Sequence, residues 1–473
     1  MSKKKKTIEE LLEEAILPDE EQSYEVPRNW VWTRVENAIK PMETREPNKL
    51  DGEAFHYIDV DAIDNKKQLV RQIKEVEITL APSRAKRKVS KDDVIISLVR
   101  PYLKNIAHID IEDNKLVAST AFYVCTPKKI LNSSYLYSYL CSNYATQYLI
   151  DHTRGDNSPS VRSTDYEKMP LPLPPVNEQK RIAEKVERLL SKIEEAKQLI
   201  EEAKETFELR RAAILEKAFR GELTKKWRGE NLKESSDTEV VQTDKTLYNL
   251  PFNWEWIDLD TVCEKITDGT HHSPKSYPSG DYMYITAKNI KKQGILLDNV
   301  TYVSKEVHQE IYNRCDVKKG DVLYIKDGAT TGIATVNQIT EEFSLLSSVA
   351  LLRPKRNVLA AKYLMYCLNS PSTKSRMLGM ISGNAITRLT LKKIKQGIIP
   401  LPPFDEQEII VSILEKVNSV DEQLDCVTNL EDNINNLKQS ILSKAFRGEL
   451  GTNDPSEESA IELLKEVLQD QVK

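Results

Sequence analysis

Pro172-Leu-Pro-Pro175, followed by Asn177-Glu-Gln179, recurs about 228 residues later as Pro400-Leu-Pro-Pro403, followed by Asp405-Glu-Gln407. A repeat of this length is not a solenoid unit, because such units are about 20 to 50 residues long. The pattern instead predicts a duplicated domain whose two copies end at the same proline-rich segment. A chain built in this way has pseudo-two-fold symmetry, which suits a partner with the same symmetry, such as duplex DNA.

The duplication extends on both sides of the proline-rich segments. Ala218-Phe-Arg-Gly-Glu-Leu223 recurs unchanged as Ala445-Phe-Arg-Gly-Glu-Leu450, and residues 26–32 are echoed by residues 250–256, both with an Asn-Trp-x-Trp pattern. The paired tryptophans favour an anchoring role in each core over stacking on nucleic-acid bases. Residues 461–468 also resemble residues 8–16, so we expect the two termini to lie near one another.

Each copy mixes strand and helix signals. Apolar runs bounded by turn-forming residues predict strands at 94–99, 121–124, 321–325 and 348–352, and helices at 135–150 and near 360–368. We therefore predict an α+β fold, in which two mixed α and β globular domains are separated by two long antiparallel coiled-coil helices. The predicted segments are an N-terminal helical segment (1–23), a first globular domain (24–174), a first long helix (175–226), a linker (227–246), a second globular domain (247–402), a second long helix (403–450) and a C-terminal helical tail (451–473).

A heptad pattern follows each proline-rich segment, because proline cannot lie in a helix interior and the helix must begin after it. Apolar residues then recur at steps of three and four among Glu and Lys, which is typical of a coiled-coil seam. Each helix of about 40 residues would be about 60 Å long. The second copy has a break at Glu431. The predicted seam residues are Ile182, Val186, Leu189, Ile193, Ile200, Phe207, Ile413, Val417, Val420, Leu424, Val427 and Ile434.

The composition of the chain restricts where the protein can act and which molecules it can bind. No apolar run approaches the roughly 20 residues of a membrane span, and the lysines at positions 3–6 precede no apolar stretch of a signal peptide. The six cysteines form no C-x-x-C pair, which indicates reduced thiols in the cytoplasm and no zinc site. The net charge is −5, but residues 245–398 carry 21 Lys and Arg against 14 Asp and Glu. Because the local field decides phosphate affinity, this domain remains suited to nucleic acid.

Signatures of catalysis are missing from the sequence. No G-x-G pattern or P-loop occurs, so no cofactor is expected. Leu401-Pro-Pro-Phe404 resembles the motif of amino-methyltransferases, but those enzymes need a polar side chain where Leu401 stands. Asp113-Asn-Lys115 has the Asp-x-Lys spacing of some nucleases without the accompanying Pro-Asp, which favours a solvated turn.

Two regions predict contacts with DNA. Residues 267–274, Thr-Asp-Gly-Thr-His-His-Ser-Pro, form a turn-rich stretch whose side chains can address base edges or phosphates. Residues 84–88 form a basic cluster in a loop-like stretch. His271 and His272 have no third ligand nearby, so no metal site is predicted. The candidate DNA-binding residues are Arg84, Lys86, Arg87, Lys88, Arg100, Arg162, Thr270, His271, Lys275, Lys288, Lys326 and Arg388.

Taken together, these motifs resemble the specificity (S) subunit of type I restriction-modification systems. The matching features are the two proline-rich segments with their Glu-Gln, the helix after each, the paired Ala-Phe-Arg-Gly-Glu-Leu ends, the Asp268-Gly-Thr-His271 loop, and Ser382-Gly-Asn with Arg388. The resemblance covers nearly the whole chain. It places Gly383 and Arg388 at the end of the second recognition domain, with Gly155 and Arg162 at comparable places in the first.

The resemblance implies a division of labour. Two target-recognition domains would each read one half of a split double-stranded DNA sequence, and the helices would act as spacer and as docking surface for two methyltransferase subunits. A motor-nuclease restriction subunit would join the complex, and the S subunit itself would carry no catalysis. Two other interpretations remain open: a coiled-coil scaffold whose repeats bind proteins rather than DNA, and a specificity subunit that serves a fused restriction-methylation enzyme.

Overall fold

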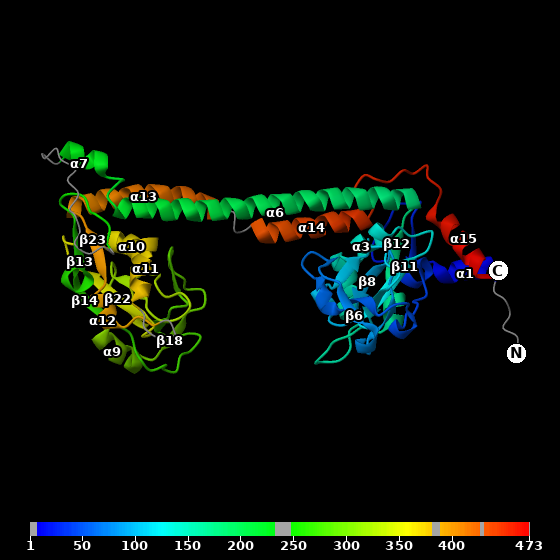
Figure 1. Cartoon of the computed structure of the whole chain (residues 1–473), viewed down its shortest axis with the longest axis horizontal. Coiled ribbons are helices and arrows are strands. Elements are labelled where there is room, and N and C mark those ends of the chain that lie inside the picture. The colour runs from blue at the N-terminus through cyan, green and yellow to red at the C-terminus, as the bar shows by residue number, and fades with distance from the viewer. Residues whose placement is uncertain (1–6, 232–246, 381–387, 426–429, 473) are drawn as a thin grey trace. The chain divides into compact units, whose positions relative to one another are not determined.

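The computed structural model describes residues 7–231, 247–380, 388–425 and 430–472 (Figure 1). The chain divides into two compact units, one formed by residues 1–199 with 428–473 and the other by residues 200–427. Both units mix helices and strands, which confirms the predicted α+β class. In the described part of the chain, no helix combines the length and the apolar character needed to cross a bilayer.

The first unit is built on two four-stranded sheets with the orders β6-β3-β10-β7 and β2-β11-β8-β9. Strand β3 runs parallel to β10, whereas β11 runs antiparallel to β8, with Tyr123 opposite Ile96. The runs predicted at 94–99 and 121–124 lie in β8 and β11 and supply the buried centre of the second sheet. The strands are β2 (Ile39–Lys40), β3 (Ala54–Ile58), β6 (Lys74–Glu77), β7 (Ala85–Lys88), β8 (Val94–Ser97), β9 (Ile106–His108), β10 (Leu116–Ser119) and β11 (Phe122–Pro127).

The second unit repeats this plan. Its sheets have the orders β14-β22-β19-β20 and β18-β15-β21, and β15 runs parallel to β21 as β3 does to β10. The predicted strands at 321–325 and 348–352 are β19 and β22, and the predicted helix near 360–368 is α10 (Ala361–Asn369). The strands are β14 (Cys263–Asp268), β15 (Tyr282–Ile285), β18 (Thr301–Val303), β19 (Val322–Ile325), β20 (Ala334–Val336), β21 (Phe343–Leu345) and β22 (Val349–Pro354).

The helix predicted at 135–150 is divided into two helices. They are α3 (Ser133–Leu140) and α4 (Asn143–Asp151). Ser142 lies between them with extended backbone angles, and its side chain accepts a hydrogen bond from the Ala145 N–H, as a helix N-cap does. The prediction of one continuous helix was therefore wrong, because apolar periodicity continues across the cap that ends one helix and starts the next.

Each proline-rich segment forms a strand. β12 (Pro170–Leu173) pairs with β1 (Val31–Arg34), and β23 (Ile398–Leu401) pairs with β13 (Glu255–Asp258). The carbonyls of Pro172 and Pro400 accept hydrogen bonds from the Tyr135 and Tyr363 hydroxyls and not from the paired strand. The proline nitrogens face the same side, where the strand pairing needs no N–H. The segments therefore close each domain by joining its end to its tryptophan-bearing start.

The long helices are α6 (Val176–Phe219), α13 (Phe404–Asp425) and α14 (Leu430–Phe446). In the first unit, Ile182 near the start of α6 shares a core with Phe446 at the end of α14. In the second unit, Phe219 at the end of α6 shares a core with Ile410 near the start of α13. In each unit, one end of α6 therefore meets the opposite end of its partner helix, as the antiparallel prediction requires.

Burial of the predicted seam is strongest near the helix ends. Ile182 and Val186 are buried, and a larger group is partly buried, while Val420, Leu424 and Val427 lie outside the residues whose side chains are described. The heptad count missed Leu215, Leu414 and Leu442, which are buried because the helix ends pack on a globular domain as well as on a helix. The partly buried seam residues are Leu189, Ile193, Ile200, Phe207, Ile413, Val417 and Ile434.

The segments at the chain ends and after α6 also have defined structure. Helices α1 (Ile8–Ala15) and α15 (Ala460–Val472) share one core, which confirms that the terminal segments lie together. Helix α7 (Lys225–Asn231) occupies the first part of the stretch predicted as a linker. That prediction is corrected for residues 227–231, because the buried Arg228 holds this helix against the second domain.

Candidate nucleic-acid interface

One framework is present in both units and is centred on the glutamate that follows each proline-rich segment. In the first unit, Trp30 Nε1 and Asn453 Nδ2 each donate a hydrogen bond to Glu178 Oε2 at 2.8 Å. Glu178 is fully buried, and burial raises its pKa, although the bonds from Trp30 and Asn453 oppose the shift. The glutamate thus joins the start of the domain, the start of α6 and the segment after α14.

In the second unit the corresponding glutamate, Glu406, has a charged partner, Arg228. Trp254 Nε1 donates to Glu406 Oε2 at 2.9 Å, and Arg228 Nη1 and Thr224 Oγ1 each donate to Glu406 Oε1 at 2.6 Å. The arginine forms a buried ion pair, with its side chain 10% exposed. Trp30 and Trp254 are therefore core anchors, as the sequence predicted.

Glycines complete this framework where the Ala-Phe-Arg-Gly-Glu-Leu segments end their helices. Gly221 has φ +76° and Gly448 has φ +73°, the left-handed conformation that often terminates a helix. A Cβ on Gly221 would lie 2.4 Å from Pro251 Cγ, and one on Gly448 would lie 2.4 Å from Pro27 Cγ. Each helix end is thereby fitted to the proline that precedes the tryptophan pair.

The predicted loop at 267–274 begins where β14 ends. Asp268 is 1% exposed, and a Cβ on Gly269 would lie 1.9 Å from the Leu345 carbonyl oxygen, so only glycine allows this close passage. Thr270 then forms a bridge to Leu346, and His271 emerges with a side chain 44% exposed. The loop is thus anchored to a buried strand end and presents its imidazole at the surface.

A row of ion pairs extends from this loop into the domain. Lys326 Nζ lies 3.4 Å from Asp268 Oδ2 and 2.8 Å from Asp327 Oδ2. Arg314 Nη2 lies 2.5 Å from Asp268 Oδ1 and 3.2 Å from His271 Nε2. We call Asp268, Lys326 and Asp327 the buried ion row; Asp268 and Lys326 are buried, and the side chain of Asp327 is 21% exposed.

Arg388 lies at the other end of the buried ion row. Its Nε is 3.5 Å from Asp327 Oδ1, and its side chain is 56% exposed. The structure therefore links the histidine loop to Arg388 through the buried ion row, a connection that the sequence did not show. Gly383, predicted to belong with Arg388, lies outside the described residues.

The buried ion row removes one of the predicted DNA-binding residues and brings another residue into consideration. Lys326 is 1% exposed, so it cannot contact DNA as predicted; its ammonium is enclosed by carboxylates. Arg314, which the sequence analysis missed, ends α9 (Lys305–Arg314) with its side chain half exposed. A basic residue in the last turn of a helix is common, and nothing in the local pattern distinguished this one.

The first domain has no counterpart of the buried ion row. Backbone pairing matches Leu98 to Lys326, because the Val161 N–H donates to Leu98 as the Leu389 N–H donates to Lys326. Val99 is bridged to Ser160 as Asp327 is bridged to Arg388. Ser160, and not Arg162, therefore occupies the place of Arg388.

Arg162 instead corresponds to Thr390, since each precedes a short helix at its N-cap, α5 (Ser163–Glu167) or α12 (Leu391–Lys395). The proposed equivalence of Arg162 with Arg388 was wrong by two residues. The residues that precede Arg162 and Arg388 differ too much in sequence for the two segments to be aligned without the strand pairing.

Most of the basic cluster at 84–88 is a strand and not a loop: β7 covers Ala85–Lys88, and Arg84 lies in the turn before it. Strand β7 pairs with β10 on one side, and on the other the Arg45 N–H donates to the Lys86 carbonyl at 3.0 Å. Backbone hydrogen bonds on both sides keep the cluster extended. Arg84 and Lys86 are exposed, while Lys88 forms a surface ion pair with Glu43 at 2.6 Å.

The remaining candidates lie on the surfaces of the two domains. Arg100 has φ +51° and is exposed at the end of the turn that follows β8 in the first domain. Lys275 and Lys288 are exposed in the second domain, and Lys275 lies over the Tyr277 ring at 5.3 Å. None of these residues belongs to the buried ion row of the second domain.

Nothing described suggests a nucleophilic thiol or a metal centre. Burial raises the pKa of the Cys125 thiol to about 12 and that of Cys141 to about 11. Among residues with described positions, no three His, Cys, Asp or Glu side chains gather as metal ligands.

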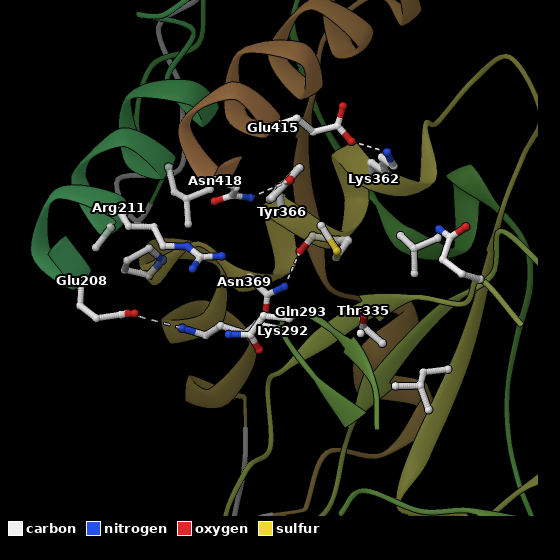
Figure 2. A pocket seen from close by; sticks show the side chains of 18 of the residues that line it. Glu208, Arg211, Lys292, Gln293, Thr335, Lys362, Tyr366, Asn369, Glu415 and Asn418 are labelled. Atoms are coloured by element: carbon white, nitrogen blue, oxygen red, sulfur yellow. Dashed lines mark hydrogen bonds and ion pairs between the residues drawn. The ribbon is translucent and has the colours of Figure 1, made fainter. Parts of the chain in front are cut away.

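A cavity of about 550 Å³ lies in the second unit between α6, α10, α13 and the β16–β17 hairpin (β16 Ile290–Lys291, β17 Gly294–Ile295) (Figure 2). Lys292 Nζ lies 3.9 Å from Glu208 Oε2 on α6, and Lys362 pairs with Glu415 on α13. Both lysines reach from the domain to a helix carboxylate. The wall of the cavity therefore ties the long helices to the domain.

Comparisons with known proteins agree with this architecture. The family model described as "Type I restriction modification DNA specificity domain" matches residues 40–205 and 251–435. The specificity subunit of the EcoBI type I restriction enzyme of Escherichia coli is 31% identical over 59% of this chain and 58% of that subunit. The EcoKI specificity subunit of E. coli strain K12 is 23% identical over 69% of this chain and 68% of its own.

Solved structures show the same fold. A chain from a study of complex assembly and conformational transition in a type I R-M system is 28% identical, with a TM-score of 0.72, and covers 90% of this chain and 100% of that one. The HsdS subunit of Thermoanaerobacter tengcongensis is 26% identical, with a TM-score of 0.58, and covers 91% and 100%. With the family model matched in both copies, the chain belongs to the DNA specificity subunits of type I restriction-modification systems.

Proposed function

We propose that each recognition domain of this chain reads one half of a bipartite double-stranded DNA target. The observation that carries the proposal is a duplicated framework beneath surfaces that are not duplicated. Trp30 with Glu178 and Trp254 with Glu406 make matching bonds, at 2.8 and 2.9 Å, whereas the place of Lys326 is taken by Leu98 in the first domain. Equivalent scaffolds with different surfaces suit two different half-sites.

The long helices would set the spacing between half-sites and dock two methyltransferase subunits, and a motor-nuclease subunit would join for restriction. α6 supports this role, because it continues without interruption over 44 residues. The helix also exposes Leu199 and Leu209, at 66% and 73%, which a docked methyltransferase subunit would cover. The chain itself would supply recognition and no catalysis.

Exchange of residues 24–170 for the matching segment of a related subunit tests the proposal. The methylated motif of cells that carry the exchanged chain with its methyltransferase should change in one half-site and keep the other. A change in both half-sites would contradict the assignment of one domain to one half-site. Purified chain alone should transfer no methyl group to DNA, and the chain with its methyltransferase should bind duplex DNA in a salt-dependent way. A protein-binding scaffold would show no such binding.

A further inference from the structure

The buried ion row of the second domain has an excess of negative charge. Lys326 and Asp268 are each 1% exposed, and buried charges are costly unless they are paired. Asp268 and Asp327 flank the one ammonium of Lys326, so one negative charge is left over. Arg314 and Arg388 contact the two ends of the row and more than offset this negative charge from the surface. The row thereby holds two surface guanidinium groups in place.

Arg388 is held by its backbone as well as by its side chain. Asp327 and Arg388 form an antiparallel bridge, and the Leu389 N–H donates to the Lys326 carbonyl at 2.8 Å. Arg388 Nε lies 3.5 Å from Asp327 Oδ1, and this buried oxygen accepts no hydrogen bond from any described group. No described residue accepts a hydrogen bond from the two terminal nitrogens of Arg388. The end of the guanidinium that makes paired hydrogen bonds is therefore left for a ligand.

The chemistry of this arrangement favours a base over a phosphate. Guanine presents two acceptors, O6 and N7, in the major groove, and arginine bonds both at once. The carboxylate of Asp327 beside Arg388 repels a phosphate, whereas the edge of a guanine carries no net charge. A guanidinium whose orientation is set beforehand loses less freedom on binding.

We infer that Arg388 reads a guanine in the half-site of the second recognition domain, and that Asp327, Lys326 and Asp268 are its positioning residues. The inference rests on the proposed DNA-reading function. The first domain offers an internal control, because Leu98, Val99 and Ser160 stand at the corresponding places and cannot form this row. The first half-site is therefore read without it.

The test is the methylated motif in cells carrying the chain with its methyltransferase subunit. Arg388→Ala should relax one position, a guanine in the unmodified motif, with a loss of discrimination of roughly 5- to 150-fold. The matched variant Arg388→Lys keeps the charge but not the paired hydrogen bonds, so it should relax the same position. The other half-site should stay unchanged. Relaxation at a base pair without guanine in either variant, or an unchanged motif, would overturn the inference.

The positioning role needs its own variant. Lys326→Met should relax the same guanine position, because Asp327 would lose its partner and Arg388 its support. Asp327→Asn, which keeps the shape of the side chain, provides the same test if the first variant does not accumulate. If these variants lower methylation equally at all sites and relax no position of the motif, then Lys326 and Asp327 only stabilise the fold. A wild-type motif that persists without this chain would reject the proposed function, whereas a chain-dependent motif unchanged by Arg388→Ala rejects only the inference.

Discussion

Replacing the same buried glutamate by glutamine in each copy of the framework should have unequal effects on stability. Glu406→Gln removes the partner of Arg228, whose side chain is 10% exposed, and leaves a buried guanidinium without its counter-charge. Breaking a buried ion pair in this way costs about 3–5 kcal/mol. Glu178 accepts hydrogen bonds from the neutral Trp30 and Asn453, and its burial disfavours the charged form, so Glu178→Gln leaves no unpaired charge and should cost at most about 1.5 kcal/mol, the net value of a hydrogen bond between neutral groups.

Hydrogen–deuterium exchange followed by mass spectrometry can measure the two effects separately, because it reports the opening free energy of each domain in one experiment. Protection of β19 in the second domain should fall by the larger amount in Glu406→Gln, and protection of β8 in the first domain by the smaller amount in Glu178→Gln. Adding Arg228→Met to Glu406→Gln should restore part of the loss, since no unpaired charge remains.

Equal losses of protection in the two variants would refute the reasoning, because both sites share the tryptophan bond and differ in the charged partner. Failure of Arg228→Met to restore stability would also refute it. The unmodified domain of each variant serves as the internal control. Its protection should not change, since the described hydrogen-bond partners of each glutamate lie in its own unit.

Three further results are expected. Insertion of four residues after Ala203 lengthens α6 by about 6 Å, which is nearly two base pairs at 3.4 Å each. The non-specific spacer of the methylated motif should therefore become longer, while both half-sites stay the same. An active variant with an unchanged spacer would leave α6 only a docking role. Gly221→Ala or Gly448→Ala should lower the melting temperature, because the positive φ and a Cβ at 2.4 Å from proline both oppose a side chain, whereas Gly229→Ala, with open space, should not. Burial raises the pKa of Glu178 above its ordinary value of 4.5, so the contribution of Glu178 to stability is complete below pH 4.5 and is lost as the pH rises through the pKa of the folded state. Glu178→Gln should therefore flatten this part of a plot of unfolding free energy against pH. An unchanged plot would contradict the burial argument.

The framework could be predicted from the sequence to a large extent. The paired tryptophans, the helix ends and the proline-rich segments were recognised because each recurs as a short continuous stretch. Their contacts then proved to be duplicated as well, as in the bonds of Gln179 to the Ile130 and Pro174 carbonyls and of Gln407 to the Val358 and Pro402 carbonyls. Each repeated motif makes the same contacts in both domains, because the segment on which it packs was duplicated together with it.

The sequence by itself determined the duplicated α+β domains and the helices that follow them, because periodicity and repeats are local properties of the chain. Only the tertiary structure decided which charged residues are buried in ion pairs and which lie at the surface. Lys326 was counted among the DNA contacts but is enclosed by Asp268 and Asp327, while Arg314 went unnoticed and lies at the surface. These residues come from separate strands, loops and helix ends, and whether a charge meets water or a counter-charge depends on how distant segments fold together. The buried ion row therefore has no signature along the chain.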